Sequence, residues 1–290
     1  MLALACAAWG VSFVFLKDSD RILEGALGGT GMTAACWVVT VRFLVAGLVL
    51  LAWPGVLRGL SRPVLRDSLW LALPSALGYV LQAAGMRGLE AGTNAFLTSL
   101  YTPFTPLLAW LLFRKMPAGR VLVAVAVAMA GVAVLTGPSG NGFGWYEFLV
   151  VIGAVCWAFQ ILIIDRVARR HPAGSFSSGY FLWTGVLGLI ALLLFRGDAT
   201  AGDLLGALLR PDLQLPIWGL ALLSTLFTLV VLVKYQPDLD PSRAALLYVM
   251  EPAFAAVFAM ALHGEPFGGY KGIGCLMLLG ANVLVEIRRR

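Results

Sequence analysis

Charged residues are scarce in this chain. Only 12% of its 290 residues are Asp, Glu, Lys or Arg, whereas 60% are hydrophobic. Soluble domains carry about 25% charged residues. A water-soluble core could not bury so much apolar surface, so the composition excludes an ordinary soluble domain and predicts an integral membrane protein.

The residues of metal and redox chemistry are also few, with two histidines and four cysteines. The cysteines lie singly in apolar segments without paired spacing, which predicts free thiols. His171 and His263 have no second ligand at metal spacing, so we expect both at the membrane interface. The motifs of serine hydrolases, zinc proteases and phosphate-binding loops are absent too. We therefore expect no metal, no cofactor and no enzymatic activity.

Long apolar runs are what the chain has instead. Residues 91–113, 121–146, 172–195 and 213–233 contain no charged residue. About 20 apolar residues cross the hydrocarbon layer as a helix, and the runs do not alternate as barrel strands would. The sequence predicts an all-α integral membrane fold with ten transmembrane helices, at 2–16, 33–53, 68–87, 92–113, 121–137, 145–165, 175–195, 214–233, 241–262 and 268–286.

The net charge of +6 is explained by membrane topology, without a nucleic acid partner. The basic residues lie between apolar runs, and Lys and Arg favour cytoplasmic loops. With a cytoplasmic N-terminus, 14 of the 21 Lys and Arg residues fall inside, six fall outside, and Arg42 lies within a helix. The first run lacks a positive flank, which favours a spanning helix over a signal peptide. Both termini are predicted to be cytoplasmic.

The chain carries an internal repeat with a spacing of 149 residues. Thr102-Pro103 matches Glu251-Pro252, and the other matches are Ala95 with Ala244, Pro117 with Pro266, Gly119 with Gly268 and Gly131 with Gly280. The repeat predicts two five-helix halves, 1–137 and 145–290. Since five is odd, the second half enters the membrane inverted. Inverted repeats of this kind place a substrate site at mid-membrane and allow alternating access.

Several short motifs resemble a known family. The first helix contains Trp9-Gly10-Val11-Ser12-Phe13, the second Arg42-Phe43, and the ninth ends with Gly264-Glu265-Pro266. Together with Pro103 and Pro252, they resemble the drug/metabolite transporter superfamily, in particular its ten-helix EamA-type bacterial members. The resemblance implies a basket-shaped bundle around a central cavity lined by helices 1, 3, 4, 6, 8 and 9. It also implies an inner-membrane carrier, often an exporter of amino acids or related metabolites. Met116 departs from the family where the first half would carry a counterpart of Glu265.

Glu251 is the most informative single residue, because it is a carboxylate inside a spanning run. A charge at the bilayer centre costs about 2.5–3.5 kcal/mol, so it needs a partner, a wet cavity or a proton. One interpretation is that Glu251 couples proton movement to substrate movement. The alternative is a neutral glutamate that stabilises the helix bend at Pro252.

Polar and aromatic residues recur on single helix faces. Asn94, Thr98 and Tyr101 share a face of the fourth helix, and Ser75, Tyr79 and Gln82 share one of the third. A polar stripe in lipid must face protein or water, so these residues either line a cavity or join helices. The candidate substrate contacts are Trp9, Phe13, Tyr79, Gln82, Asn94, Thr98, Tyr101, Trp157, Gln160 and Tyr248. The alternatives to substrate contact are ordinary packing inside the protein and anchoring at the membrane interface.

Arg42 and the two mid-helix prolines are assigned structural roles. Arg42 could bind a substrate carboxylate, but such an arginine more often pairs within the protein or reaches the head groups. Pro103 and Pro252 each free a backbone carbonyl and bend the helix, and we expect them to shape or hinge the cavity.

The sequence therefore predicts a secondary transporter of small metabolites, amino acids or related compounds and aromatic ones among them, in the bacterial inner membrane. Its expected partners are a small-molecule substrate and the lipid bilayer, and one chain is expected to act as a monomer. Export by alternating access with proton coupling is favoured. The alternatives are an uptake or facilitative permease of the same fold, or a membrane-embedded enzyme or lipid-handling protein.

Overall fold

The computed structural model describes residues 1–27, 31–114, 116, 118–136, 143–235, 248, 250–266 and 268–286. Helices make up all the regular structure in these ranges, and no strand occurs there. The helices are α1 (Leu2–Leu27), α2 (Gly31–Leu51), η1 (Leu57–Gly59), α3 (Arg62–Met86), α4 (Ala91–Thr98), α5 (Tyr101–Phe113), α6 (Gly119–Thr136), α7 (Trp145–Val167), η2 (Ala168–Arg170), α8 (Ala173–Phe195), α9 (Ala201–Leu208), α10 (Pro211–Trp218), η3 (Gly219–Phe227), α11 (Thr228–Tyr235), α13 (Met250–His263) and α14 (Gly269–Glu286).

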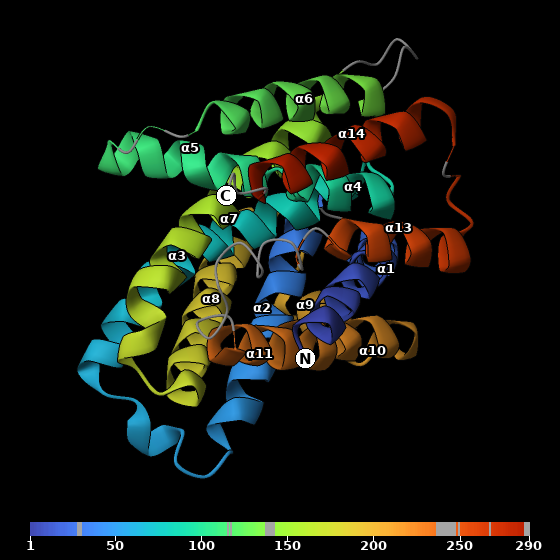
Figure 1. Ribbon diagram of the computed structural model, residues 1–290. Helices are drawn as coiled ribbons and strands as arrows, with labels where there is room; N and C mark the ends of the chain where they lie inside the picture. Colours follow the sequence, from blue (N-terminus) through green and yellow to red (C-terminus); the bar gives the residue numbers. More distant parts are fainter. Residues whose placement is uncertain are drawn as a thin grey trace.

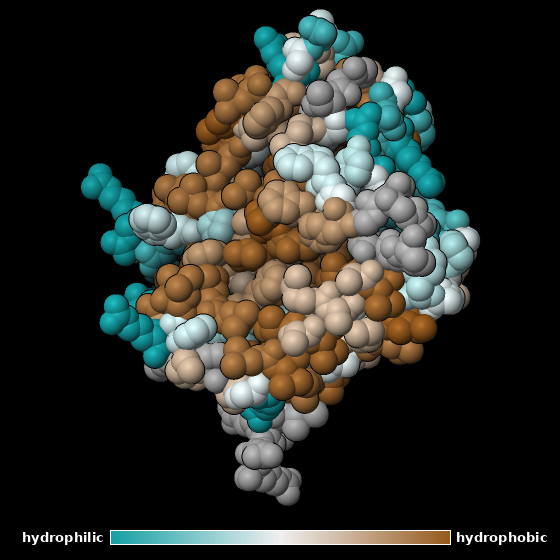
Figure 2. All heavy atoms as spheres, turned by 90° about the horizontal axis from the view of Figure 1, so that it is seen from above, coloured by the Kyte–Doolittle hydropathy of each residue, from teal (hydrophilic) through white to brown (hydrophobic). Residues whose placement is uncertain are grey.

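Many of these helices are suited to a membrane. Within the described residues, six helical stretches are long and apolar enough to cross one: Gly31–Leu51, Arg62–Met86, Ala91–Phe113, Trp145–Arg170, Ala173–Phe195 and Pro211–Tyr235. Three shorter apolar helices accompany them. Exposed leucine, valine and isoleucine side chains on α5, α6 and α14 are in keeping with a lipid-facing surface. Figure 2 shows apolar residues across the middle of one face and hydrophilic ones toward its edges. The protein is a multi-pass membrane protein.

The main helix contacts join the first half of the chain to the second. The pairs are α2 with α8, α3 with α7, α1 with α13, and α6 with α14. In Figure 1 the pair of α6 and α14 runs side by side along the top of the molecule. Small residues permit the close approach: a Cβ on Gly10 of α1 would lie 2.6 Å from the Cβ of Phe254 in α13.

The first predicted helix, 2–16, is too short, because α1 continues to Leu27 through the expected loop. Charges at positions 17–21 suggested the helix end, but the continuation keeps an apolar face. Leu23 and Leu27 are buried, and the Lys17 Nζ donates hydrogen bonds to the carbonyl oxygens of Met86 and Leu89, at 2.8 and 2.7 Å.

Two other predicted helices are interrupted. The helix at 92–113 is divided into α4 and α5 by a turn at Ser99 and Leu100, shortly before Pro103. The helix at 214–233 is observed as α10, the π-helical η3 and α11.

The connection at 196–213 contains an unpredicted helix, α9. The sequence signal was a capping box, in which Thr200 and Asp203 bond each other's backbone N–H. Residues 241–247 and 249 of the predicted ninth helix, and Pro117, lie outside the described residues.

Candidate functional site

A cavity of about 80 Å³ lies among the helices. A water molecule needs roughly 10–15 Å³ of such space, so the cavity can hold several. Its walls come from both halves of the chain. The lining residues are Trp9, Ser12, Phe13, Arg42, Tyr79, Gln82, Thr98, Tyr101, Trp157, Gln160, Ile161, Ile164, Ser224, Leu232, Tyr248 and Glu251.

The structure brings nearly all the candidate substrate contacts to this one cavity. Trp9, Phe13, Tyr79, Gln82, Thr98, Tyr101, Trp157, Gln160 and Tyr248 line it, as does Glu251. Asn94 differs, since it is fully buried outside the lining. Its Nδ2 donates to the Gln82 carbonyl oxygen at 3.1 Å, so it joins α4 to α3.

Glu251 is a buried carboxylate at the cavity wall, with 7% of its surface exposed. The Tyr101 hydroxyl donates a hydrogen bond to its Oε2 at 3.2 Å. Tyr101 is the first residue of α5, so the turn that ends α4 places this hydroxyl against α13. The Trp9 and Tyr248 rings lie 6.2 Å apart in the same wall. Glu251 thus faces aromatic and hydroxyl groups in a space large enough for water.

Arg42, for which a structural role was favoured over substrate binding, lies on the same cavity. Its side chain is buried, and its Nε donates to the Thr225 Oγ1 at 2.8 Å and its Nη2 to the Ser224 Oγ at 3.2 Å. Both hydroxyls belong to η3. The guanidinium carbon also lies over the rings of Phe43 and Tyr79, at 5.2 and 5.0 Å.

Hydrogen bonds from the predicted polar stripes link neighbouring helices, and two amide side chains on the cavity lining, Gln82 and Gln160, take part. The Gln82 Nε2 donates to the Thr98 Oγ1 at 3.0 Å, which joins α3 to α4. The Ser75 Oγ donates to the Gln160 Oε1 at 3.1 Å, which joins α3 to α7. Both sequence interpretations of the stripes, cavity lining and interhelical bonding, therefore describe features of the structure.

The prolines lie beside the site and not on it. Pro103 is in the first turn of α5, directly after the interruption that positions Tyr101. Pro252 follows Glu251 in the first described turn of α13 and is buried. Their expected part in shaping or hinging the cavity stays a prediction.

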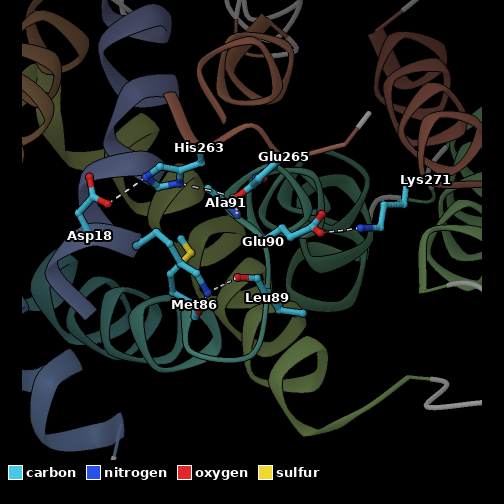
Figure 3. A network of polar contacts seen from close by, with 10 residues as sticks. Asp18, Met86, Leu89, Glu90, Ala91, His263, Glu265 and Lys271 are labelled. Atoms are coloured by element: carbon cyan, nitrogen blue, oxygen red, sulfur yellow. Dashed lines mark hydrogen bonds and ion pairs between the residues drawn. The ribbon is translucent and has the colours of Figure 1, made fainter. Parts of the chain in front are cut away.

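A separate polar network surrounds the N-terminus of α4 (Figure 3). The Glu265 carboxylate accepts hydrogen bonds from the backbone N–H groups of Ala91 and Gly92, at 2.8 and 3.0 Å. Nearby, a His263 ring nitrogen lies 2.9 Å from an Asp18 oxygen, and Lys271 donates to Glu90 at 2.6 Å. The network connects α1, α4, α13 and α14. His263 is therefore held by acidic neighbours, and its expected position at the membrane interface stays a prediction.

The sequence reasoning missed some of the lining. Ser12, Ser224, Ile161, Ile164 and Leu232 were not among the candidates. The serines could have been found: Ser12 is one helical turn after Trp9, and Ser224-Thr225 is a pair of hydroxyls in an uncharged run. Nothing in the pattern distinguishes the aliphatic residues from ordinary packing. In the described ranges, no group of three or more His, Cys, Asp or Glu residues could hold a metal ion.

Comparison with known proteins gives the family. The EamA-like transporter family matches residues 1–137 and 144–287. A protein of Archaeoglobus fulgidus named an uncharacterized transporter is 24% identical over 297 residues, covering 99% of this chain and 85% of the relative. The uncharacterized inner membrane transporter YedA of Escherichia coli K12 is 28% identical over 257 residues, covering 85% of this chain and 80% of the relative.

A solved crystal structure shares the fold. It has a TM-score of 0.57 and 17% identity, and the match covers 96% of this chain and 95% of the other. The family match spans nearly the whole chain, and the relatives are named transporters. The chain belongs to the EamA-like transporter family.

Proposed function

We propose that this transporter is a secondary active carrier that exports small metabolites, amino acids or related compounds and aromatic ones among them, from the cytoplasm. The observation that carries the proposal is the cavity between the two halves of the chain, which has Glu251 in its wall. The aromatic lining suits flat or apolar side chains, since rings offer large contact area and Tyr and Trp add a polar group.

The pattern of helix contacts supports ten helices in two inverted halves, 1–137 and 145–290. Under the proposed exchange of halves, α1 corresponds to α7, α3 to α10, η3 and α11, and α4 with α5 to α13. The contact of α1 with α13 then has a counterpart in α7 with α4 and α5. The contact of α3 with α7 has one in α1 with η3 and α11. Rocking of two such halves about the cavity would give alternating access.

The proposed location is the bacterial inner membrane, with both termini in the cytoplasm. The Lys and Arg bias supports the orientation, and a relative is named an inner membrane transporter. The proposed working unit is a monomer, because both halves of a single chain contribute described residues to the cavity lining.

Glu251 is the proposed proton site. A carboxylate buried at this depth is costly when charged and unpaired, and its described hydrogen bond comes from a neutral hydroxyl, that of Tyr101. Proton binding on one side and release on the other would make one conformational change depend on the proton and the other on the substrate.

Proteoliposomes test the proposal. Wild-type protein should exchange labelled amino acids in counterflow and accumulate them under an imposed pH gradient. Glu251→Gln should lose gradient-driven accumulation but keep counterflow, because the cavity remains. Glu24→Gln, an exposed change in α1, should behave like wild type. Full gradient response in Glu251→Gln would refute coupling through this carboxylate. Wild-type counterflow without any gradient response would favour a facilitative permease, and substrate turnover without transport would favour an enzyme.

A further inference from the structure

Arg42 is a buried charge with neutral partners. It is 4% exposed, and its hydrogen bonds to described residues go to two hydroxyls, those of Ser224 and Thr225. No ion pair within the described ranges includes it. A buried guanidinium without a counter-charge is unfavourable inside a membrane protein, and such residues mark substrate or ion pathways.

The cavity offers few alternatives for neutralising this charge. Of its described lining residues, Arg42 and Glu251 alone have side chains that are ordinarily charged at neutral pH. The described hydrogen bond of Glu251 comes from Tyr101 on α5, whereas Arg42 is bonded to η3. The Arg42 guanidinium and the Glu251 carboxylate therefore line the same cavity, but each has its own hydrogen-bond partners.

The Arg42 guanidinium is held in place with donors to spare. Its Nε and Nη2 bond the η3 hydroxyls, which fixes the plane, and the rings of Phe43 and Tyr79 lie at 5.2 and 5.0 Å from its central carbon. Arginine has five N–H donors, and the Nη1 group has no hydrogen bond among the described residues. A guanidinium fixed in this way matches the two oxygens of a carboxylate.

Trp157 adds a second unsatisfied donor to the same group of residues. Its ring lies 4.2 Å from that of Tyr79, which in turn contacts Arg42. The indole is buried on the cavity lining, and its Nε1 has no acceptor in the described part of the chain. A buried N–H without an acceptor costs about 1–3 kcal/mol. A ligand oxygen would reach this enclosed N–H only if the indole turned toward the cavity, and the hydrogen bond gained would favour that turn.

We propose that Arg42 and Trp157 form the binding site for the carboxylate group of the transported substrate, so that the carrier selects organic acids and amino acids over their neutral or purely cationic analogues. The inference rests on the proposed function, in that the cavity is the transport site. It assigns Arg42 to substrate selection and Glu251 to the proton.

Binding to the purified full-length protein tests the assignment with matched probes. L-phenylalanine is compared with L-phenylalaninamide, and 3-phenylpropionate with 3-phenylpropanamide and phenyl phosphate. Wild type should bind each carboxylate at least about tenfold more tightly than its amide, because hydrogen bonds to charged groups are the stronger ones. Arg42→Gln should bind acid and amide equally. Trp157→Phe keeps an aromatic ring but removes the N–H, and it should reduce the difference in affinity between acid and amide. Arg62 is exposed, and Arg62→Gln should leave that difference unchanged.

The wild-type comparison decides the matter even if Arg42→Gln does not fold. Equal binding of acid and amide to wild type, tighter binding of phenyl phosphate than of the carboxylates, or no binding of any probe would overturn the assignment. So would an Arg42→Gln variant that binds amides normally and keeps the preference for acids. Counterflow separates this failure from failure of the carrier proposal: transport of amides as fast as acids leaves a carrier without a carboxylate site, whereas transport of nothing refutes both.

Discussion

Tyr101 and Tyr248 lie in the same cavity wall as Glu251 but differ in what their hydroxyls contact. The Tyr101 hydroxyl donates to Glu251, whereas the Tyr248 hydroxyl is enclosed with no partner among the described residues. Loss of a hydrogen bond to a buried acceptor costs about 1–3 kcal/mol, but removal of an unsatisfied hydroxyl costs little. The two tyrosines therefore form a natural pair for comparison.

Tyr101→Phe is expected to lower the free energy of unfolding of the ligand-free protein in detergent by about 1–3 kcal/mol, because the Glu251 carboxyl group loses its hydrogen-bond donor. Tyr248→Phe should leave the stability unchanged or slightly raised. Thermal unfolding followed by intrinsic fluorescence measures both. Equal destabilisation by the two variants would show that the hydrogen bond to Glu251 contributes nothing particular.

Individual site residues could be predicted where a polar side chain occurs within an apolar, membrane-spanning run. Glu251, Gln82, Thr98 and Gln160 interrupt apolar runs, and the structure places all four on the cavity. The same signal cannot tell a side chain on the lining from one that bonds a neighbouring helix. Asn94 shares the face of Thr98, yet the rotation of α4 against α3 directs it to the Gln82 carbonyl. That rotation depends on helix packing and cannot be predicted from the spacing of residues in the sequence.

At the scale of elements, Glu265 closes the start of α4. The first N–H groups of a helix have no intrahelical partner, and a carboxylate there satisfies them and suits the helix dipole. The cap comes from beyond α13, so it ties two distant segments together (Figure 3). In the first half, the matching Met116 has no carboxylate and is exposed.

Glu265→Ala is expected to lower the free energy of unfolding by roughly 1–2 kcal/mol, since the backbone N–H groups of Ala91 and Gly92 lose their acceptor. Glu90→Ala is the control, because it removes a neighbouring, partly exposed ion pair with Lys271 that is worth at most about 1 kcal/mol. Thermal unfolding of the two variants and of Glu265→Gln, which should fall between them, gives the order. A Glu90→Ala variant less stable than Glu265→Ala would contradict the capping role.

Gly10 sets how closely α1 packs on α13. A Cβ there would lie 2.6 Å from the Phe254 Cβ and 2.9 Å from the Ala255 backbone nitrogen. Overpacking of this kind costs about 1–3 kcal/mol, so Gly10→Ala should lower stability and slow counterflow by displacing Trp9 from Tyr248. Gly25→Ala in the same helix meets nothing within 4 Å and should be neutral or stabilising. Equal effects of the two substitutions would exclude close packing at Gly10.

Helices in uncharged runs were predictable, but their ends and interruptions were less so. Charge near position 17 predicted an end that the buried Leu23 and Leu27 overrule. Pro103 was the sequence signal for the turn at Ser99 and Leu100, because proline has no backbone N–H to donate to the preceding helical turn. The π-helical η3 had no sequence signal that we recognise. It brings Ser224 and Thr225 together on Arg42, which agrees with the frequent occurrence of such turns at functional sites.

At the scale of the whole molecule, composition predicted a helical membrane protein because 60% of the residues are hydrophobic and few are charged. The repeat spacing of 149 residues led to the prediction of two halves, 1–137 and 145–290, and this division stays a prediction. Inversion of the halves and the cytoplasmic position of both termini stay predictions. The orientation of the termini depends on the membrane, because it is set by the Lys and Arg residues of the loops.

The central claim is that this cavity opens alternately to the two sides of the membrane. Ser12→Cys, on the cavity lining, tests it most directly in a protein whose four native cysteines are replaced by alanine. A membrane-impermeant thiol reagent should label this cysteine in both right-side-out and inverted vesicles, and substrate should slow the labelling. Ser177→Cys, fully buried in α8, should remain unlabelled. Labelling of Ser12→Cys from one side alone under every gradient, or from neither side, would contradict the account.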